Sequence, residues 1–129
     1  MILAVDVGNT ETLIGLYSGS DVQRSWRIST QRHPTGDEMA LMLSGLLATE
    51  VSGVGSVDRA VIASVVPAID RSWDEAFEQL GIPSRRIDAS SPLPVTLDVD
   101  EPASVGADRI VNTLGTRCLY ARNTIVVDL

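Results

Sequence analysis

The sequence predicts an α/β domain in which a mixed β-sheet carries helices on its faces. Two observations predict this class. The first 29 residues contain three short strand-like runs joined by tight turns, which is typical of an antiparallel meander. Beyond residue 36, segments with helical periodicity alternate with short apolar runs, which is typical of helices that pack on a sheet.

The expected strands are apolar or alternating runs bounded by turn residues. The turn at residues 8–11 separates the first two, and the turn at residues 18–21 separates the second from the third. A later apolar run stops at Pro67. The sequence predicts strands at residues 1–7, 12–17, 22–29 and 59–66, a short edge strand at most at 85–88, and a last buried strand at 124–129.

Helices are expected where apolar residues recur at i, i+3, i+4 and i+7. The predicted helices span residues 37–49, 69–80 and 107–121. Residues 89–102 contain three prolines and are expected to form a loop. The resulting order, β-β-β-α-β-α-β-α, is that of a ribonuclease-H-like mixed sheet with helices on its faces.

A broken internal repeat indicates the domain organisation. Ile125–Leu129 resembles Ile2–Gly8, and the aspartates Asp128 and Asp6 fall in register. The repeat predicts one domain over residues 1–123 and, at residues 124–129, the first strand of a truncated, duplicated second domain. The alternative is a coincidental edge strand, because buried strands resemble one another.

Composition narrows the class of partner. The chain has 129 residues and a net charge of −7, and an acidic surface repels nucleic-acid backbones. The sequence contains no run of about 20 apolar residues, which is the length that a membrane-spanning helix needs. The start of the chain does not resemble a signal peptide, and Cys118 is the single cysteine. We therefore expect a cytoplasmic protein without nucleic-acid or membrane partners.

The missing residue types narrow the chemistry. All ten basic residues are arginines, so a lysine-dependent phosphate loop is excluded. His33 is the single histidine and lies in a polar stretch, which disfavours a Ser-His-Asp triad and a multi-histidine metal site. Carboxylates, hydroxyls, backbone amides and arginines must carry any chemistry.

The first candidate motif is Asp6–Thr12, at the end of the first expected strand. Gly8 allows close backbone approach to a ligand, and the amides of a tight turn can converge on an anion. Thr10 and Thr12 add hydroxyl donors, and Asp6 can hold Mg²⁺ through water. The motif predicts a phosphate loop without lysine. A simple hairpin turn is the alternative, since Gly-Asn is a common connection.

The second candidate motif is Val105–Asn112, where a glycine precedes a helix. Asp108 suits a helix N-terminus, but Arg109 faces the positive end of the helix dipole. Arg109 could pair with a carboxylate of the protein or hold an anionic substrate. Asp108 could then orient a hydroxyl and accept its proton during phosphoryl transfer.

Four segments, in order and with matching spacing, resemble the type III pantothenate kinase family over the whole chain. They are Asp6–Thr10, Trp26–Thr30, Ser64–Pro67 and Gly106–Asn112. The resemblance implies a two-domain, duplicated ribonuclease-H-like fold and phosphorylation of pantothenate by ATP to 4′-phosphopantothenate, the first step of coenzyme A synthesis. It also implies Mg²⁺, a monovalent cation (K⁺ or NH₄⁺) and a homodimer.

The resemblance also implies roles for individual residues. Asp108 would be the general base, Asp6 would hold Mg²⁺ through water, and Asp128 would ligate the monovalent cation. The ATP-phosphate loop would comprise Asp6, Val7, Gly8, Asn9, Thr10, Glu11, Thr12 and Leu13. Pantothenate would be bound by Gly106, Ala107, Asp108 and Arg109.

Three departures from the family pattern qualify these expectations. Glu11 stands where asparagine is frequent, and Val99 stands where an aromatic residue is common near the substrate. A second, Gly-Thr-rich phosphate loop would follow Asp128, so we expect the 129-residue chain to be inactive alone. Two alternatives remain: a non-catalytic accessory or regulatory relative, and a ribonuclease-H-like nuclease, which would need more converging carboxylates.

Overall fold

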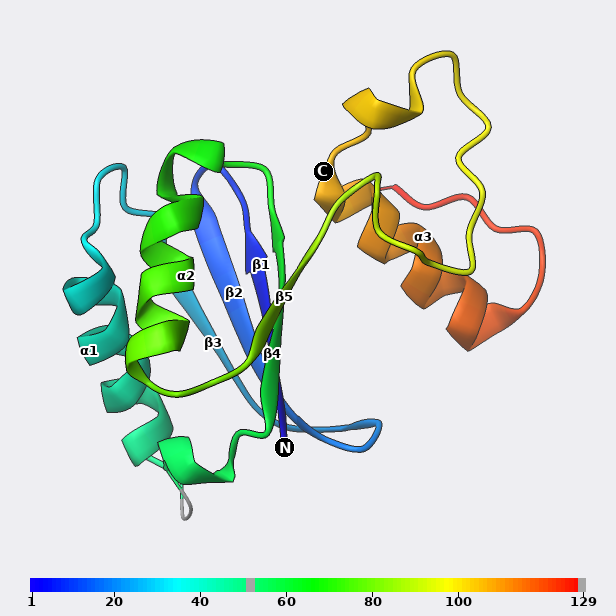
Figure 1. Cartoon of the computed structure of the whole chain (residues 1–129). Coiled ribbons are helices and arrows are strands. Elements are labelled where there is room, and N and C mark those ends of the chain that lie inside the picture. The colour runs from blue at the N-terminus through cyan, green and yellow to red at the C-terminus, as the bar shows by residue number, and fades with distance from the viewer. Residues whose placement is uncertain (51–52, 128–129) are drawn as a thin grey trace.

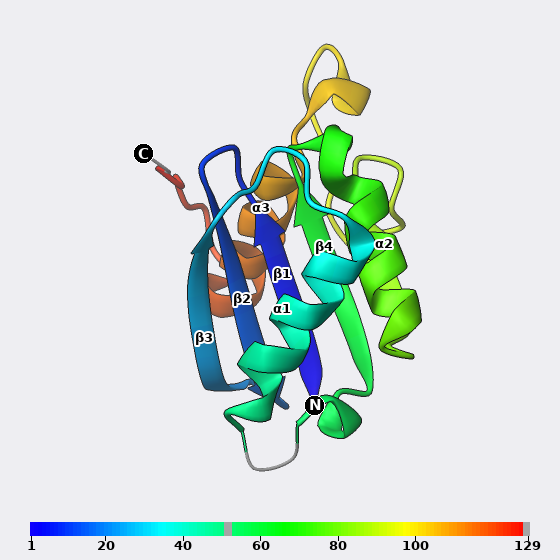
Figure 2. The same ribbon diagram turned by 90° about the vertical axis from the view of Figure 1, so that its left-hand side faces the viewer.

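The computed structural model describes residues 1–50 and 53–127 and has three layers (Figure 1, Figure 2). A central sheet carries two helices on one face and one on the other. The strands are β1 (Ile2–Val7), β2 (Glu11–Ser18), β3 (Asp21–Ser29), β4 (Arg59–Ser64) and β5 (Ser84–Ile87). The helices are α1 (Gly36–Ala48), α2 (Asp70–Gln79) and α3 (Ala107–Tyr120).

The sheet is mixed, with the order β3-β2-β1-β4-β5. β1, β2 and β3 form the antiparallel meander, whereas β4 pairs in parallel with β1 and β5 in parallel with β4. This arrangement confirms the predicted ribonuclease-H-like fold. The expected edge strand near residues 85–88 is present as β5. β4 ends at Ser64, two residues before its predicted end, because Pro67 begins a 3₁₀ turn (Pro67–Ile69).

The hydrophobic core lies between the sheet and the helices α1 and α2. Alternate residues of β1 (Leu3, Val5 and Val7) are buried on this face, as the two-residue period of a strand requires. Trp73 and Phe77 of α2 are also buried, and their ring centroids lie 5.8 Å apart. The predicted periodicity of these helices is therefore confirmed by their packing.

The start of α1 is capped in a way that we did not anticipate from the sequence. Thr35 and Glu38 form a capping box: the Thr35 hydroxyl accepts from the Glu38 amide, and the Glu38 carboxylate accepts from the Thr35 amide. The amide and the hydroxyl of Thr35 both donate to the Glu38 carboxylate, which lowers the pKa of Glu38. The cap fixes the point at which the chain enters α1.

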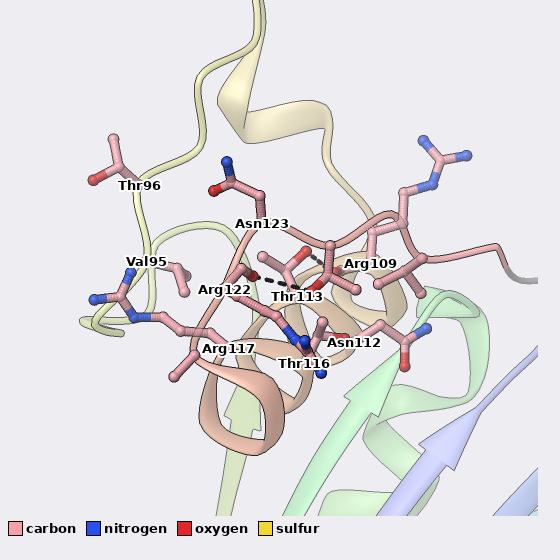
Figure 3. A pocket seen from close by; sticks show the side chains of 12 residues that line it. Val95, Thr96, Arg109, Asn112, Thr113, Thr116, Arg117, Arg122 and Asn123 are labelled. Atoms are coloured by element: carbon pink, nitrogen blue, oxygen red, sulfur yellow. Dashed lines mark hydrogen bonds between the residues drawn. The ribbon is translucent and has the colours of Figure 1, made fainter.

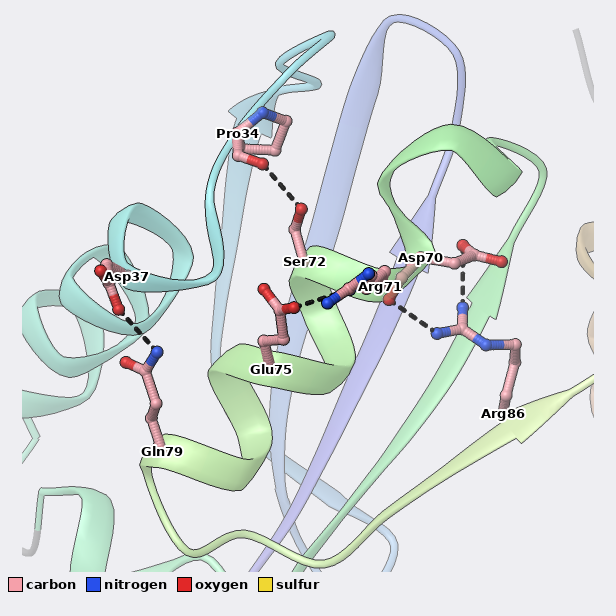
Figure 4. Close-up of polar contacts among 8 residues, drawn as sticks. All are labelled: Pro34, Asp37, Asp70, Arg71, Ser72, Glu75, Gln79 and Arg86. Carbon is pink, nitrogen blue, oxygen red and sulfur yellow. Dashed lines mark hydrogen bonds and ion pairs between the residues drawn. The ribbon is translucent and has the colours of Figure 1, made fainter.

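Polar contacts hold α1, α2 and β5 together at the rim of this core (Figure 4). Gln79 Nε2 donates to Asp37 Oδ1 at 2.6 Å, which joins α2 to α1. Arg86 of β5 forms ion pairs with Asp70 and Asp74 at the start of α2, at 2.8 and 2.6 Å. The Arg86 ion pairs orient the start of α2, which follows β4 after a 3₁₀ turn, and the Gln79 bond holds the end of α2 against α1.

α3 packs on the opposite face of the sheet, against β4. Ala107 and Ile110 are buried there. α3 leaves the β2 and β3 side of this face open, and a groove of about 590 Å³ runs along it. None of the described helices is long and apolar enough to cross a membrane.

The expected strand at residues 124–129 does not form in the part that the structure describes. Residues 124–127 belong to no strand and are exposed, with Ile125 at 89% and Val127 at 73% exposure. A strand needs a hydrogen-bonded neighbour, and no described strand lies beside this segment. Asp128 and Leu129 lie outside the described residues. The assignment of residues 124–129 to a second domain stays a prediction.

Two leucines of α1 test the position of the core. Leu43 is fully buried whereas Leu41 is 76% exposed. Leu43→Ala should lower the free energy of unfolding by about 2–5 kcal/mol, since it leaves a cavity. Leu41→Ala should change it by less than about 0.5 kcal/mol. Urea denaturation of both variants measures the difference, and equal losses would contradict the observed packing.

Candidate active site

The first predicted motif forms a tight turn between β1 and β2. The Gly8 amide donates to the Glu11 carbonyl at 3.0 Å and closes the turn. A Cβ atom at Gly8 would lie 2.9 Å from that carbonyl oxygen, so only glycine fits without a backbone shift. Neither Asn9 nor Thr10 has a positive φ, so the turn is not of the I′ or II′ type that hairpins favour.

The turn presents backbone donors at the surface. Asn9 and Thr10 are exposed, and their backbone N–H groups have no hydrogen-bond partner among the described residues. Adjacent unpaired amides in a turn can bind an anion. This favours the phosphate-loop interpretation of the turn over that of a plain hairpin connection.

The two threonines of the motif differ in burial, since Thr12 is buried and Thr10 is exposed. Its side chain is 1% exposed, and its hydroxyl oxygen lies 2.9 Å from that of Thr30. The Thr12 hydroxyl therefore lies inside the protein behind the turn, while Thr10 is exposed on it. Sequence spacing placed both hydroxyls in one motif, but Thr10 belongs to the turn, whereas Thr12 belongs to β2 and shares its buried face with Ile14 and Leu16.

The second predicted motif forms the N-terminus of α3. Gly106 is the N-cap residue, and Asp108 accepts a hydrogen bond from the Arg109 amide through Oδ1 at 2.8 Å. Asp108 is half-buried and Arg109 is exposed. A Cβ atom at Gly106 would lie 2.5 Å from Asp108 Oδ1, so the glycine leaves room for this carboxylate. Asp108 also favourably faces the positive end of the helix dipole.

Val65 brings the two motifs together at one edge of the sheet. The Val65 amide donates to the Val7 carbonyl at 3.0 Å, directly before the first turn. A Cβ atom at Gly106 would lie 3.6 Å from Val65 Cγ1, in van der Waals contact. The turn after β1 and the start of α3 therefore lie at the same end of the molecule, as Figure 1 shows. Parallel strands gather ligand-binding groups at their carboxyl ends.

Val65 was part of a family-like segment in the sequence, but its bridging position was not predicted. The signal available was Ser64–Pro67, which follows a predicted strand. The Ser64 hydroxyl accepts from the Val66 amide at 3.1 Å and shapes the exit from β4. Nothing in the sequence alone showed that this exit lies beside residue 106.

Asp6 lies on the α3 side of the sheet. It pairs with Leu13 on β2 and Ala63 on β4 in the strand register, and it lines the open groove with Val111 of α3. Val111 lies one helical turn after Asp108, so the two residues share one side of α3. A carboxylate at a strand end, beside a loop that binds phosphate, is an oxygen ligand that suits a hydrated Mg²⁺ ion. In the described residues, no group of three His, Cys, Asp or Glu side chains could hold a metal.

Glu11, the unusual residue of the turn, has a partner. Its Oε2 lies 3.3 Å from the Arg27 guanidinium on β3. Both side chains are more than half exposed, so the pair contributes little to stability. It nevertheless places a cation beside the one carboxylate that would repel a phosphate group at this turn.

A pocket of about 820 Å³ lies between α3, residues 95–96 and the segment after α3 (Figure 3). Arg109, Thr113 and Arg117 recur at i, i+4 and i+8, so they lie along one side of the helix. In Figure 3 the guanidinium groups of Arg109 and Arg117 lie far apart, at different ends of the pocket. Among the described residues, the pocket is lined by hydroxyl, amide and guanidinium groups and by apolar side chains, and by no carboxylate.

The geometry described above includes neither Asp128 nor Val99. Asp128, the expected cation ligand, is outside the described residues. Val99, which stands where an aromatic residue is common near the substrate, is 52% exposed and belongs to the loop between β5 and α3.

Gly8 and Gly45 provide a test of the turn geometry. Gly8→Ala should lower the free energy of unfolding by about 1–3 kcal/mol, because its methyl group forces a backbone carbonyl to move. Gly45 lies in α1 with nothing within 4 Å of an added Cβ. Gly45→Ala should therefore raise stability by about 0.5–1 kcal/mol. Thermal unfolding should show shifts of opposite sign, and a shift of the same sign would refute the close approach at Gly8.

Comparisons with known proteins agree on one family. The family model "Type III pantothenate kinase" matches residues 2–129. Proteins described as type III pantothenate kinase are similar over 99% of this chain: 36% identical in Desulfosudis oleivorans, and 40% in Salinispora arenicola and Frankia alni. The chain spans about half the length of these relatives, between 50% and 51%. It belongs to the type III pantothenate kinase family.

Proposed function

We propose that the protein containing this chain transfers the γ-phosphoryl group of ATP to pantothenate and forms 4′-phosphopantothenate. One observation carries the proposal: the turn at residues 8–10 and the start of α3 both lie beside Val65, at the carboxyl edge of β1 and β4. Because the chain spans about half the length of the relatives, the activity is proposed for a protein of their length.

The turn after β1 supplies the nucleotide side of the proposed site. The amides of Asn9 and Thr10 and the Thr10 hydroxyl would bind phosphate oxygens. A site without lysine must bind the triphosphate through such dipoles and through metal ions. Mg²⁺ would neutralise phosphate charge when bound, with Asp6 as its protein ligand through water.

The start of α3 supplies the acceptor side. The Asp108 carboxylate would orient the pantothenate hydroxyl and accept its proton as the new P–O bond forms. Arg109 would hold the pantothenate carboxylate by a charge-assisted hydrogen bond. The hydroxyl and amide groups beside Arg109 along α3 suit a substrate with hydroxyl and amide groups of its own.

The family's other features remain proposals for this chain. A monovalent cation, K⁺ or NH₄⁺, would bind at Asp128. A homodimer would complete the substrate site, and the enzyme would act in the cytoplasm. None of these three features enters the reaction steps assigned to Asp108 and Arg109.

Asp108→Asn in the intact protein should lower kcat about 10²- to 10⁴-fold. Asparagine keeps the shape and a hydrogen bond but cannot accept the proton, so KM for pantothenate should change much less. A coupled ADP-release assay at saturating MgATP, with the pantothenate concentration varied, measures both constants. A kcat within a few-fold of wild type would leave Asp108 with a positioning role only.

Arg109→Ala is the contrasting variant on the adjacent residue. It should raise KM for pantothenate more than it lowers kcat, because it removes a binding contact that is present before and during the reaction. Arg71→Ala, at a position on α2 that is 89% exposed and outside the pocket that Arg109 lines, is the control for a general loss of positive charge.

The 129-residue chain assayed alone should show no pantothenate-dependent ADP release. Phosphoryl transfer requires charge stabilisation from several directions, and the relatives have about twice this length. The same assay with the intact protein is the positive control. Turnover by the isolated chain would show that its two motifs suffice.

A further inference from the structure

The segment Trp26–Thr30 is a family-like segment to which the proposed reaction assigns no role. Its last residue, Thr30, directly follows β3. Thr30 is half-buried and lies against the turn between β1 and β2, about twenty residues away in sequence. Its position raises the question of what this side chain does for that turn.

Thr30 is hydrogen-bonded to both ends of the turn. Its amide donates to the Thr10 carbonyl at 2.8 Å. Its hydroxyl donates to the Gly8 carbonyl at 2.7 Å. One residue thus fixes the peptide unit that carries the exposed Asn9 amide and the peptide unit that directly follows the exposed Thr10 amide.

The number of hydrogens that each hydroxyl can donate fixes the direction of the hydrogen bonds that link Thr12, Thr30 and Gly8. A threonine hydroxyl has one hydrogen to donate. The Thr30 hydrogen is used on the Gly8 carbonyl, so the 2.9 Å contact with Thr12 must be a hydrogen bond that Thr12 donates. The chain runs from Thr12 to Thr30 to Gly8, and such chained hydrogen bonds strengthen one another.

We propose that Thr30 is a positioning residue for the phosphate loop, holding the turn at residues 8–10 in the conformation that binds the triphosphate of ATP. Thr12 acts in the same way, through Thr30, and does not contact the nucleotide. The proposal rests on the proposed function, because it takes this turn as the ATP-phosphate loop. It extends that function to a residue on a different strand.

The test compares MgATP affinity and steady-state kinetics of variants in the intact protein. Thr30→Val removes the hydroxyl and keeps the shape, and should weaken MgATP binding about 3- to 10-fold, as expected for one lost hydrogen bond. KM for pantothenate should stay unchanged. Thr30→Ser restores the hydroxyl and should bind MgATP within about twofold of wild type.

Two further variants separate positioning from stability. Thr30→Val leaves the buried Thr12 hydroxyl without its acceptor, so this variant could lose stability. The double variant Thr12→Val with Thr30→Val removes both partners, which is close to neutral for folding. It should still show the weaker MgATP binding. Thr49→Val is the matched control. It removes a similar hydrogen bond, from the Thr49 hydroxyl to the Leu46 carbonyl, at a position far from the turn.

Each outcome decides between the proposals. Wild-type MgATP affinity in folded Thr30→Val and in the double variant would overturn the positioning role. If the wild-type protein binds MgATP but does not phosphorylate pantothenate, the proposed reaction fails, and the affinity ratios still decide the role of Thr30. If the wild-type protein binds no MgATP, the turn is not a phosphate loop and the inference falls with it.

Discussion

The parallel pairing of β1 with β4 is the constraint on which the proposed site depends. It puts the carboxyl ends of two strands that are more than fifty residues apart side by side, in the register Val7 to Ser64. The hydrogen bond from the Val65 amide to the Val7 carbonyl extends that pairing past the strand end. Because Val65 also lies beside the start of α3, where a Cβ at Gly106 would be 3.6 Å from its Cγ1, a displacement of β4 would separate the proposed phosphate loop from Asp108.

The two halves of the site are built by different physical means. The turn after β1 is an arrangement of backbone amides, held by close approach at Gly8 and by the hydroxyls of Thr12 and Thr30. The start of α3 is an arrangement of side chains, in which Asp108 uses the helix dipole and the space left by Gly106. Neither half uses lysine, in agreement with a sequence whose cations are all arginine.

The two faces of the sheet differ in how completely they are covered. α1 and α2 bury one face and supply the core, whereas α3 covers the opposite face next to β4 and leaves a groove that reaches Asp6. The core between the sheet, α1 and α2 positions the strand ends. Asp6, a carboxylate of the proposed site, lies on the open face.

The sequence by itself determined the elements, their order, both motifs and the absence of lysine chemistry, because apolar periodicity and turn residues are local signals. It also indicated the family. Only the tertiary structure decided that Val65 joins the two motifs, that Glu11 pairs with Arg27, and that Thr12 faces inward to Thr30. The buried strand expected at residues 124–129 was wrong for residues 124–127, which are exposed here. Strand formation depends on a hydrogen-bonded neighbour, and which segments become neighbours is decided by the fold and not by local sequence.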